Sequence, residues 1–463
     1  MTESPTGVAP DRVHALLERE LATFAEHHPR THTLHERARE SLLDGVPMNW
    51  MVRWAGPFPL FLESASGAHA TCVDGHDYVD LCLGDTGAMA GHGPAPVIEA
   101  VERQLRRGIT TMLPTEDATW VGGELRRRFG MPSWQFTLTA TDANRFSIRI
   151  ARAITGRPFV AVHEYCYHGS VDETFAVLAG DGSDRVVARR GNLGPPVDPA
   201  ETTRVVPFND LDALDRALAD RQVAVLLIEP ALTNVGIVLP DPGYLDGVRE
   251  ITRRHGTILI HDETHTICAG PGGVTGGSEL SGGRRYEPDM LVIGKTIGGG
   301  IPIGTYGMTT EVADRLRGAV PIEDSDVGGI GGTLAGYALS MAAARAALGE
   351  VLTAEAFERM IPLAHRWEAG VNEVIARHRA PWSVTRLGAR AEYHFMPTPP
   401  RDGADQVAHT DPELERLLHL WVMNRGVLMT PFHNMALISP ITTSADIDRH
   451  TEAFDSAVAA LFA

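Results

Sequence analysis

The chain has 463 residues, of which 43% are hydrophobic and 22% charged, so it is long enough to bury one large core or two. The formal net charge of −18 disfavours nucleic acid and anionic membranes as partners. The four cysteines lack C-x-x-C spacing, the N-terminus lacks a signal-peptide pattern, and no run approaches roughly eighteen apolar residues. We therefore expect a cytoplasmic protein without a disulfide framework or a metal site.

Helical and extended segments follow one another along the chain. Residues 11–43 have the pattern of one or two polar helices, and residues 70–81 that of a hairpin turning at Asp74-Gly75. From Val97 onward, amphipathic helices alternate with short apolar strands. The expected helices are 97–107, 143–155, 244–255 and 338–348, and the expected strands are 159–163, 223–228, 257–261 and 290–293.

This alternation predicts an α/β fold. Strands that are apolar on both faces, spaced by amphipathic helices, are typical of a mostly parallel sheet flanked by helices. After Glu350 the pattern changes to that of a smaller α+β domain. We expect residues 1–75 to form an N-terminal helical segment joining the small domain, residues 76–335 the large domain, and residues 336–463 the C-terminal small domain. Ligands of such sheets bind at the carboxyl ends of the strands.

Lys295 is the only lysine of the chain, and the other forty of its 41 cationic residues are arginines. A lysine amine can lose its proton and attack a carbonyl, whereas arginine does not deprotonate in proteins. Lys295 lies between the apolar residues 291–293 and the glycines 298–300. The sequence therefore predicts a reactive amine at a strand end, with imine formation as its chemistry.

Three other segments fall where strands are expected to end. Residues 139–144 follow a strand and begin a helix, which favours either a phosphate cradle or an ordinary helix cap. Tyr167 could lie against a planar ring or be a core side chain. Asp262 and Glu263 follow a buried strand, and two such acids are costly to bury without a cationic partner, either a protonated pyridine nitrogen or an arginine.

Together these residues resemble the class III aminotransferases of fold type I, which use pyridoxal 5′-phosphate (PLP), and most of all the glutamate-1-semialdehyde aminomutase subgroup. The resemblance extends from about Pro47 to the C-terminus. The segments that carry it, in order, are Asp74-Gly75, Gly91-His92-Gly93, residues 151–157, Tyr167-His168-Gly169, Glu229-Pro230 with Asn234 and Gly236, Asp262-Glu263, Pro288-Asp289, Gly294-Lys295 with residues 298–300, and Gly332-Thr333.

The resemblance implies a role for each matching residue near the cofactor. Lys295 is expected to form the Schiff base with PLP and to carry the proton between substrate and cofactor carbons. Asp262 is expected to keep the pyridine nitrogen protonated, so that the ring acts as an electron sink. Thr264 would pack on the ring face opposite Tyr167.

The same resemblance assigns the phosphate, the substrate and the partner subunit. Ala140 and Thr141 occupy the phosphate-loop positions, and His168, Glu229 and Asn234 match residues beside the cofactor. Thr333 matches a threonine that reaches the phosphate from the neighbouring subunit, which implies a homodimer with its site at the interface. Arg53 falls close to the position of the N-terminal arginine that binds a substrate carboxylate in the aminomutase subgroup.

Three departures from the family pattern point to a specificity distinct from that of the glutamate-1-semialdehyde aminomutase itself. Ala140 replaces the glycine usual in the phosphate loop, and Tyr337 replaces the usual asparagine. His265 stands where many relatives have Gln or Met near the ring hydroxyl, and it either tunes that hydroxyl or is a satisfied buried histidine.

Three functional hypotheses follow. In the leading one, the protein is a PLP-dependent aminotransferase that moves an amino group between a carboxylated amino donor and a keto acid. The alternative is an aminomutase of the glutamate-1-semialdehyde type, or an amino-acid racemase, on the same scaffold. Both begin at Lys295, so the cofactor residues do not separate them. In the third, Lys295 is structural and the protein binds no PLP.

Overall fold

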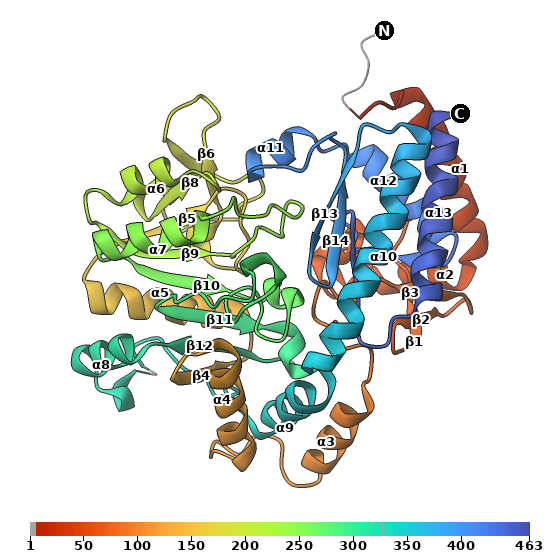
Figure 1. Ribbon diagram of the computed structural model, residues 1–463. Coiled ribbons are helices and arrows are strands. Elements are labelled where there is room, and N and C mark those ends of the chain that lie inside the picture. Colours follow the sequence, from red (N-terminus) through yellow and green to blue (C-terminus); the bar gives the residue numbers. More distant parts are fainter. Residues whose placement is uncertain (1–5, 326) are drawn as a thin grey trace. The chain divides into compact units, whose positions relative to one another are not determined.

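The computed structural model describes residues 6–325 and 327–463, which fold into two compact units. Unit 1 combines the residues up to Pro94 with Glu355–Pro400 and Gln406–Ala463, and unit 2 comprises Ala95–Ala354 with Arg401–Asp405 (Figure 1). None of the helices in this described part of the chain is long and apolar enough to cross a membrane.

Unit 2 contains a seven-stranded sheet in the order β4-β12-β11-β10-β9-β5-β8. All neighbours pair in parallel except β12, which is antiparallel to both β11 and β4. Every residue of β9 to β12 is buried, so the middle of the sheet is covered on both faces. The strands are β4 (Ser133–Thr137), β5 (Phe159–His163), β8 (Thr203–Val206), β9 (Val223–Ile228), β10 (Ile258–Asp262), β11 (Met290–Gly294) and β12 (Gly304–Met308), with a separate hairpin of β6 (Ala176–Leu178) and β7 (Val186–Ala188).

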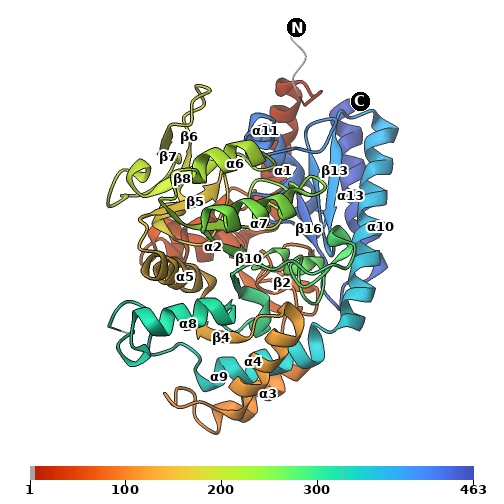
Figure 2. The same ribbon diagram turned by 60° about the vertical axis from the view of Figure 1, so that its left-hand side comes forward.

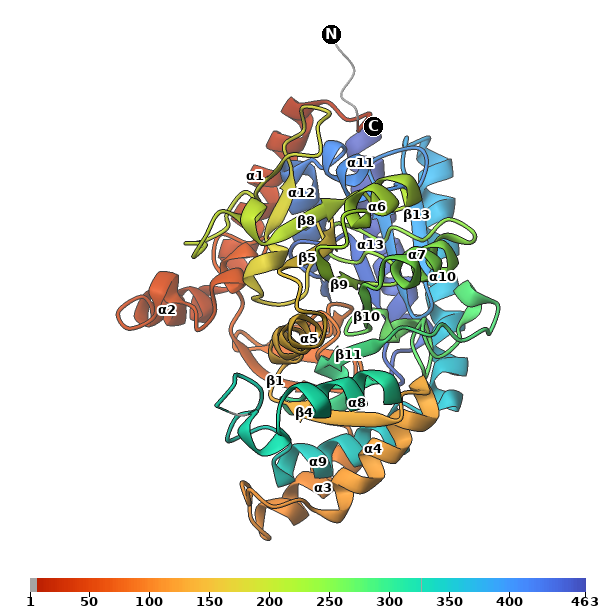
Figure 3. The ribbon, with the colours of Figure 1, turned by 90° about the vertical axis from the view of Figure 1, so that its left-hand side faces the viewer.

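Helices pack on this sheet. The helix α5 contacts β4, β12, β11 and β9, and Figure 3 looks nearly along its axis. Its apolar side is buried, and it ends at Gly156, whose positive φ of 68° suits glycine. The helices of unit 2 are α3 (Ala95–Leu105), α4 (Glu116–Phe129), α5 (Ala140–Thr155), α6 (Leu211–Leu218), α7 (Tyr244–His255), α8 (Thr310–Ala319) and α9 (Ala338–Ala346).

Unit 1 is an α+β unit with two small sheets, β1-β2-β3-β15 and β13-β14-β16. Its helix α12 packs against both α1 and α13. Two helices cross the border between the units in the sequence. The helix α10 (Ala354–His378) has its first residue in unit 2, and α11 (Gly403–Ala408) begins in unit 2 and ends in unit 1. The other elements are α1 (Pro10–His27), α2 (Pro29–Ala38), β1 (Leu62–Ser66), β2 (His69–Cys72), β3 (Asp77–Asp80), β13 (Ser383–Leu387), β14 (Arg390–His394), α12 (Pro412–Met423), β15 (Val427–Leu428), β16 (Met435–Leu437) and α13 (Ser444–Phe462).

The unit borders differ from the expected domain limits. The predicted large domain spans 76–335, whereas unit 2 spans 95–354 with a short later segment. The hairpin of β2 and β3 belongs to unit 1 because β3 pairs in parallel with β15. The helix α9 belongs to unit 2 because it packs beside α3, as Figures 1 and 2 show, through a cluster of Val97, Ala100, Ala343, Ala346 and Ala347.

We predict that Gly304→Ala destabilises unit 2. A Cβ at position 304 would lie 2.2 Å from the carbonyl oxygen of Thr139, so β12 would push away the start of α5. Such overpacking costs about 1–3 kcal/mol. The midpoint of urea unfolding should therefore fall. Gly318→Ala is the control, because a Cβ there meets nothing within 4 Å and α8 is helical at that position. Equal midpoints for the two variants would contradict the prediction.

Candidate active site

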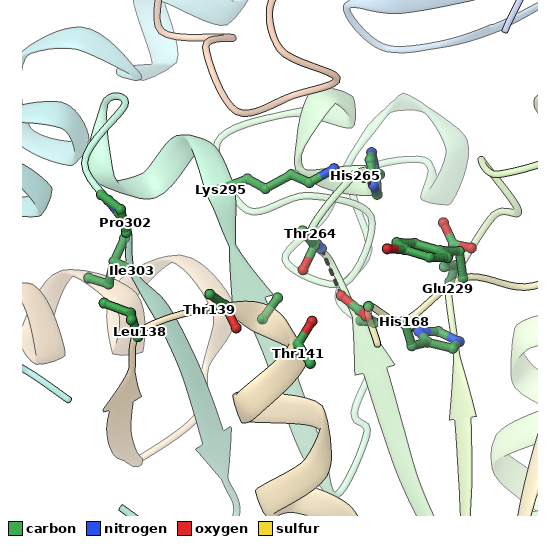
Figure 4. Close-up of a pocket in the computed structure, with 14 residues that line it drawn as sticks. Leu138, Thr139, Thr141, His168, Glu229, Thr264, His265, Lys295, Pro302 and Ile303 are labelled. Carbon is green, nitrogen blue, oxygen red and sulfur yellow. Dashed lines mark hydrogen bonds and ion pairs between the residues drawn. The ribbon is translucent and has the colours of Figure 1, made fainter. Parts of the chain in front are cut away.

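A cavity of about 300 Å³ opens in unit 2 where β4, β5, β9, β10 and β11 end. This is the edge at which ligands of parallel sheets bind. Figure 4 shows its lining side chains, which come from the segments that follow these strands. They are Leu138, Thr139, Ala140, Thr141, Tyr167, His168, Gly169, Glu229, Asp262, Thr264, His265, Lys295, Pro302 and Ile303.

Lys295 directly follows β11 and extends into this cavity (Figure 4). Its φ of 53° is in the left-handed region, which costs a non-glycine residue about 1–2 kcal/mol. Gly294 allows the close approach to α5, since a Cβ there would be 3.0 Å from the Cβ of Ala140. The Nζ of Lys295 lies 2.8 Å from Nε2 of His265.

Asp262 ends β10 and is buried. Its Oδ2 accepts hydrogen bonds from His168 Nδ1 at 2.9 Å and from Asn144 Nδ2 at 2.8 Å, and its Oδ1 accepts one from the Thr264 N–H at 3.0 Å. Burial on its own raises the pKa of Asp262, but the hydrogen bonds and the charge of His168 hold this pKa below its usual value. The carboxylate is therefore kept ionised at the cavity wall.

His168 is the positive partner of this carboxylate. Burial on its own lowers the pKa of His168, and the neighbouring Cys166 and Asp262 raise it above its ordinary value. The backbone oxygen of His168 also accepts a hydrogen bond from Asn144. His168, which the resemblance places beside the cofactor, thus also fixes the Asp262 carboxylate through a hydrogen bond.

Glu263 behaves differently from Asp262, although both were expected to need a cationic partner. Its fully buried carboxyl accepts only neutral donors among the hydrogen bonds found, from Thr266 Oγ1 at 2.5 Å, the Val274 N–H at 3.1 Å and the Thr275 N–H at 2.5 Å. Burial raises the pKa of Glu263. This side chain closes the loop 263–275, which carries Thr264 and His265.

The N-terminus of α5 has the features of an anion-binding site. Thr139 caps the helix by accepting the Asp142 N–H, so the N–H groups of Ala140 and Thr141 point out of the helix without an intrahelical acceptor. The Thr141 hydroxyl accepts the Ser170 N–H at 3.2 Å. Gly169 is required beside it, because its φ is +78° and a Cβ there would lie 2.0 Å from Thr141 Oγ1. Free N–H groups and the helix dipole together favour a phosphate.

These features fit PLP. An ionised carboxylate has about four acceptor positions, and Asp262 uses three of them within the protein, which leaves capacity for a protonated ring nitrogen. The α5 start would hold the phosphate, and the Lys295 amine would meet the aldehyde. Tyr167 and Thr264 both line the cavity in which the ring would lie.

Most residues singled out from the sequence line this one cavity, namely Ala140, Thr141, Tyr167, His168, Glu229, Asp262, Thr264, His265 and Lys295. Asn234 does not line it; its amide instead donates to the Tyr165 carbonyl at 3.3 Å and supports a neighbouring turn. Thr333 is exposed at the surface of unit 2, and Arg53 belongs to unit 1.

Sequence reasoning missed Asn144, together with the apolar wall of Leu138, Pro302 and Ile303. Asn144 is fully buried on α5, between apolar positions of the same helical face. A polar residue on the buried face of an amphipathic helix needs a partner, and that signal marks Asn144 without identifying Asp262 as the partner.

Comparisons with known proteins agree with this geometry. A family profile described as Aminotransferase class-III matches residues 50–458. The glutamate-1-semialdehyde 2,1-aminomutase of Acidobacterium capsulatum is 34% identical over 413 residues, which are 87% of this chain and 92% of that protein.

Solved structures give the same answer. A glutamate-1-semialdehyde-aminomutase from Pseudomonas aeruginosa PAO1 is 47% identical with a TM-score of 0.94, covering 98% of this chain and 100% of that chain. A lysine-to-alanine variant of that protein was solved in complex with PMP. An omega-transaminase from Sphaerobacter thermophilus is 29% identical with a TM-score of 0.82, covering 93% of this chain and 97% of that chain.

The expected fold type I architecture and the expected cofactor are thereby confirmed. The protein is a PLP-dependent enzyme, and nine of the residues singled out from the sequence line one cavity at the carboxyl end of its parallel strands. Its fold, its site and the match over residues 50–458 lead to one conclusion: this chain belongs to the class III aminotransferase family.

Proposed function

We propose that this protein is an aminomutase of the glutamate-1-semialdehyde type, which moves an amino group between adjacent carbons of one carboxylated substrate. The observation that carries the proposal is the similarity to the Pseudomonas aeruginosa aminomutase, at 47% identity over 98% of this chain. The curated relatives at 31–34% identity bear the same name. This proposal replaces the leading hypothesis from the sequence with its alternative.

The residues of the cavity support the steps that such a reaction needs. When bound, PLP supplies the electron sink that makes the hydrogen on the amino-bearing carbon acidic. The Asp262 carboxylate holds a positive charge at the far side of the cavity, and the start of α5 anchors the phosphate. The Lys295 Nζ would carry the proton between a carbon of the substrate and the carbon of the cofactor, once for each of the two substrate carbons that exchange the amino group.

A carboxylated substrate is part of the proposal. The guanidinium of Arg53 ends an exposed turn (Asn49–Arg53) and lies 5.1 Å over the ring of Phe432 within unit 1. Stacking uses the face of the guanidinium and keeps its edge N–H donors available for a carboxylate. We assign the substrate carboxylate to Arg53.

A transaminase is the second candidate. The observation that favours it is the likeness to the omega-transaminase of Sphaerobacter thermophilus, at 29% identity over 93% of this chain. The two reactions differ in whether a second keto acid is consumed.

The deciding experiment supplies glutamate 1-semialdehyde to the purified protein without any keto acid. An aminomutase converts it to the isomer with the amino group on carbon 1, 5-amino-4-oxopentanoate, mole for mole. A requirement for added pyruvate or 2-oxoglutarate, with a keto product in equal amount, would instead identify a transaminase. Loss of optical activity without isomerisation would identify a racemase.

We predict that Lys295→Ala and Lys295→Arg both abolish turnover. Arginine keeps the charge but cannot bond to the aldehyde, so charge alone should not rescue the enzyme. Because the chain has one lysine, borohydride reduction of the wild-type holoenzyme should place the pyridoxyl label on Lys295 alone, apart from the α-amino group. Peptide mass spectrometry locates the label. Substantial turnover by Lys295→Arg would refute the role of this amine.

For Asp262→Asn we expect the rate to fall at least roughly 100-fold, because charge stabilisation of this kind contributes ~3 kcal/mol or more. An asparagine cannot accept all the hydrogen bonds that the carboxylate receives, so the melting temperature should fall as well, and the rate is compared with wild type at a temperature at which both proteins are folded. Asp215→Asn serves as the control, since Asp215 pairs with His255 outside the cavity. Rates within a few fold of wild type would make Asp262 a structural residue only.

Arg53→Ala should raise KM for the carboxylated substrate about 10–100-fold, the range expected for one charge-assisted hydrogen bond of ~1.5–3 kcal/mol. PLP binding should be unchanged. Steady-state kinetics and cofactor titration separate these two effects. If KM is unaffected, the carboxylate is bound elsewhere.

Thr333 tests the proposed homodimer with its site at the subunit interface. If the partner's copy of this exposed threonine binds the phosphate, Thr333→Ala should weaken PLP retention about 2–10-fold, as for one neutral hydrogen bond. Activity should also fall on dilution together with dissociation, followed by sedimentation. An active monomer would exclude this arrangement.

A further inference from the structure

The Lys295 amine meets an imidazole inside the cavity. Its Nζ is 2.8 Å from Nε2 of His265, and Figure 4 shows the two side chains pointing toward one another from separate segments. Lys295 follows β11, and His265 follows β10. Both side chains are half-buried and line the cavity, so this contact is at the reacting atom of the site.

The chemistry of the two groups fixes the direction of the hydrogen bond. A lysine ammonium has three N–H donors and no acceptor, so while the amine is protonated, Nε2 of His265 must be the acceptor. The imidazole is then neutral, with its Nε2 lone pair aimed at the proton that Lys295 has to lose before it can act as a nucleophile.

The acidic side chains that line the cavity accept hydrogen bonds from other residues. Asp262 accepts from His168, Asn144 and Thr264, and Glu229 accepts the Thr233 hydroxyl. Imidazole is the side chain that gains and loses protons most readily near neutral pH.

Both partners are held in place by contacts within the protein itself. The loop that carries His265 is closed by the hydrogen bonds of the buried Glu263 to Thr266, Val274 and Thr275. The backbone of Lys295 is fixed at φ 53° between β11 and the following turn. A reacting pair on rigid supports keeps its geometry through the reaction.

We propose that His265 is a catalytic residue that accepts the proton of Lys295. In this step one N–H bond of the Lys295 ammonium breaks, an N–H bond forms at Nε2 of His265, and the positive charge passes from the amine to the imidazole. The neutral amine can then bond to an aldehyde carbon. The inference rests on the proposed function only in that Lys295 reacts with PLP, whichever amino-group reaction follows.

The test compares His265→Gln, His265→Ala and the control His255→Gln. Glutamine can accept a hydrogen bond from the amine but cannot take its proton. His255 pairs with Asp215 at the end of α7, outside the cavity. The full-length chain stripped of cofactor is mixed with PLP, and the rate at which the visible band of lysine-bound cofactor forms is recorded at neutral pH. Melting temperatures establish that each variant is folded.

We expect both substitutions at His265 to slow this capture at least tenfold, within the range of general base catalysis. Added imidazole should restore part of the rate in His265→Ala, and His255→Gln should match wild type. Because the chain has one lysine, trinitrobenzenesulfonate can modify only Lys295 and the α-amino group, and the rate at Lys295, followed by peptide mass spectrometry without PLP, should fall in both variants. Capture by His265→Gln at the wild-type rate would overturn the proposal, because His265 would then only orient the amine.

The two proposals can fail separately. If glutamate 1-semialdehyde is not isomerised while capture still depends on His265, only the proposed function is wrong. If isomerisation occurs and capture is indifferent to residue 265, only the role of His265 is wrong.

Discussion

The Asp262 carboxylate, at the end of the central strand β10, accepts hydrogen bonds from three different segments of unit 2. His168 comes from the loop after β5, Asn144 from α5, and Thr264 from the turn after β10 itself. Each hydrogen bond to a charged group contributes about 1.5–3 kcal/mol, whereas a buried charge without partners costs several. The same carboxylate therefore holds the pieces of the site together and supplies its negative charge.

Glu263 shows how the same strand end uses a second acid for a different purpose. It faces away from Asp262, since side chains alternate along extended backbone. Its neutral partners do not stabilise a carboxylate as His168 does, and burial raises its pKa while the pKa of Asp262 is held down. One acid offers a charge to the cavity, and its neighbour fixes the loop that places Thr264 and His265. Two neighbouring carboxyl groups thus have opposite pKa shifts because their surroundings differ.

Much of this arrangement could be predicted from the sequence. The strands 159–163 and 223–228 and the helix 244–255 lie where their periodicity placed them, because local burial on both faces decides such segments. Lys295 could be found because it is the only lysine of the chain. Asn144 could not be found in that way, since its partner Asp262 is 118 residues away in the chain. The unit border near residue 94 depends likewise on the pairing of β3 with β15, which no local pattern contains.

The Lys295 amine and the Asp262 charge do not distinguish an aminomutase from a transaminase, because both reactions need the same amine and the same charge. What differs is the fate of the substrate after its amino group has been taken up. A transaminase must release the resulting carbonyl compound, whereas an aminomutase must keep it until the amino group is returned to the neighbouring carbon. Retention depends on groups that hold the part of the substrate that does not react, as binding energy from remote groups commonly does in enzymes. A carboxylate bound by arginine is such a group, so the role proposed for Arg53 would make this residue, rather than the cofactor residues, the one that determines reaction specificity.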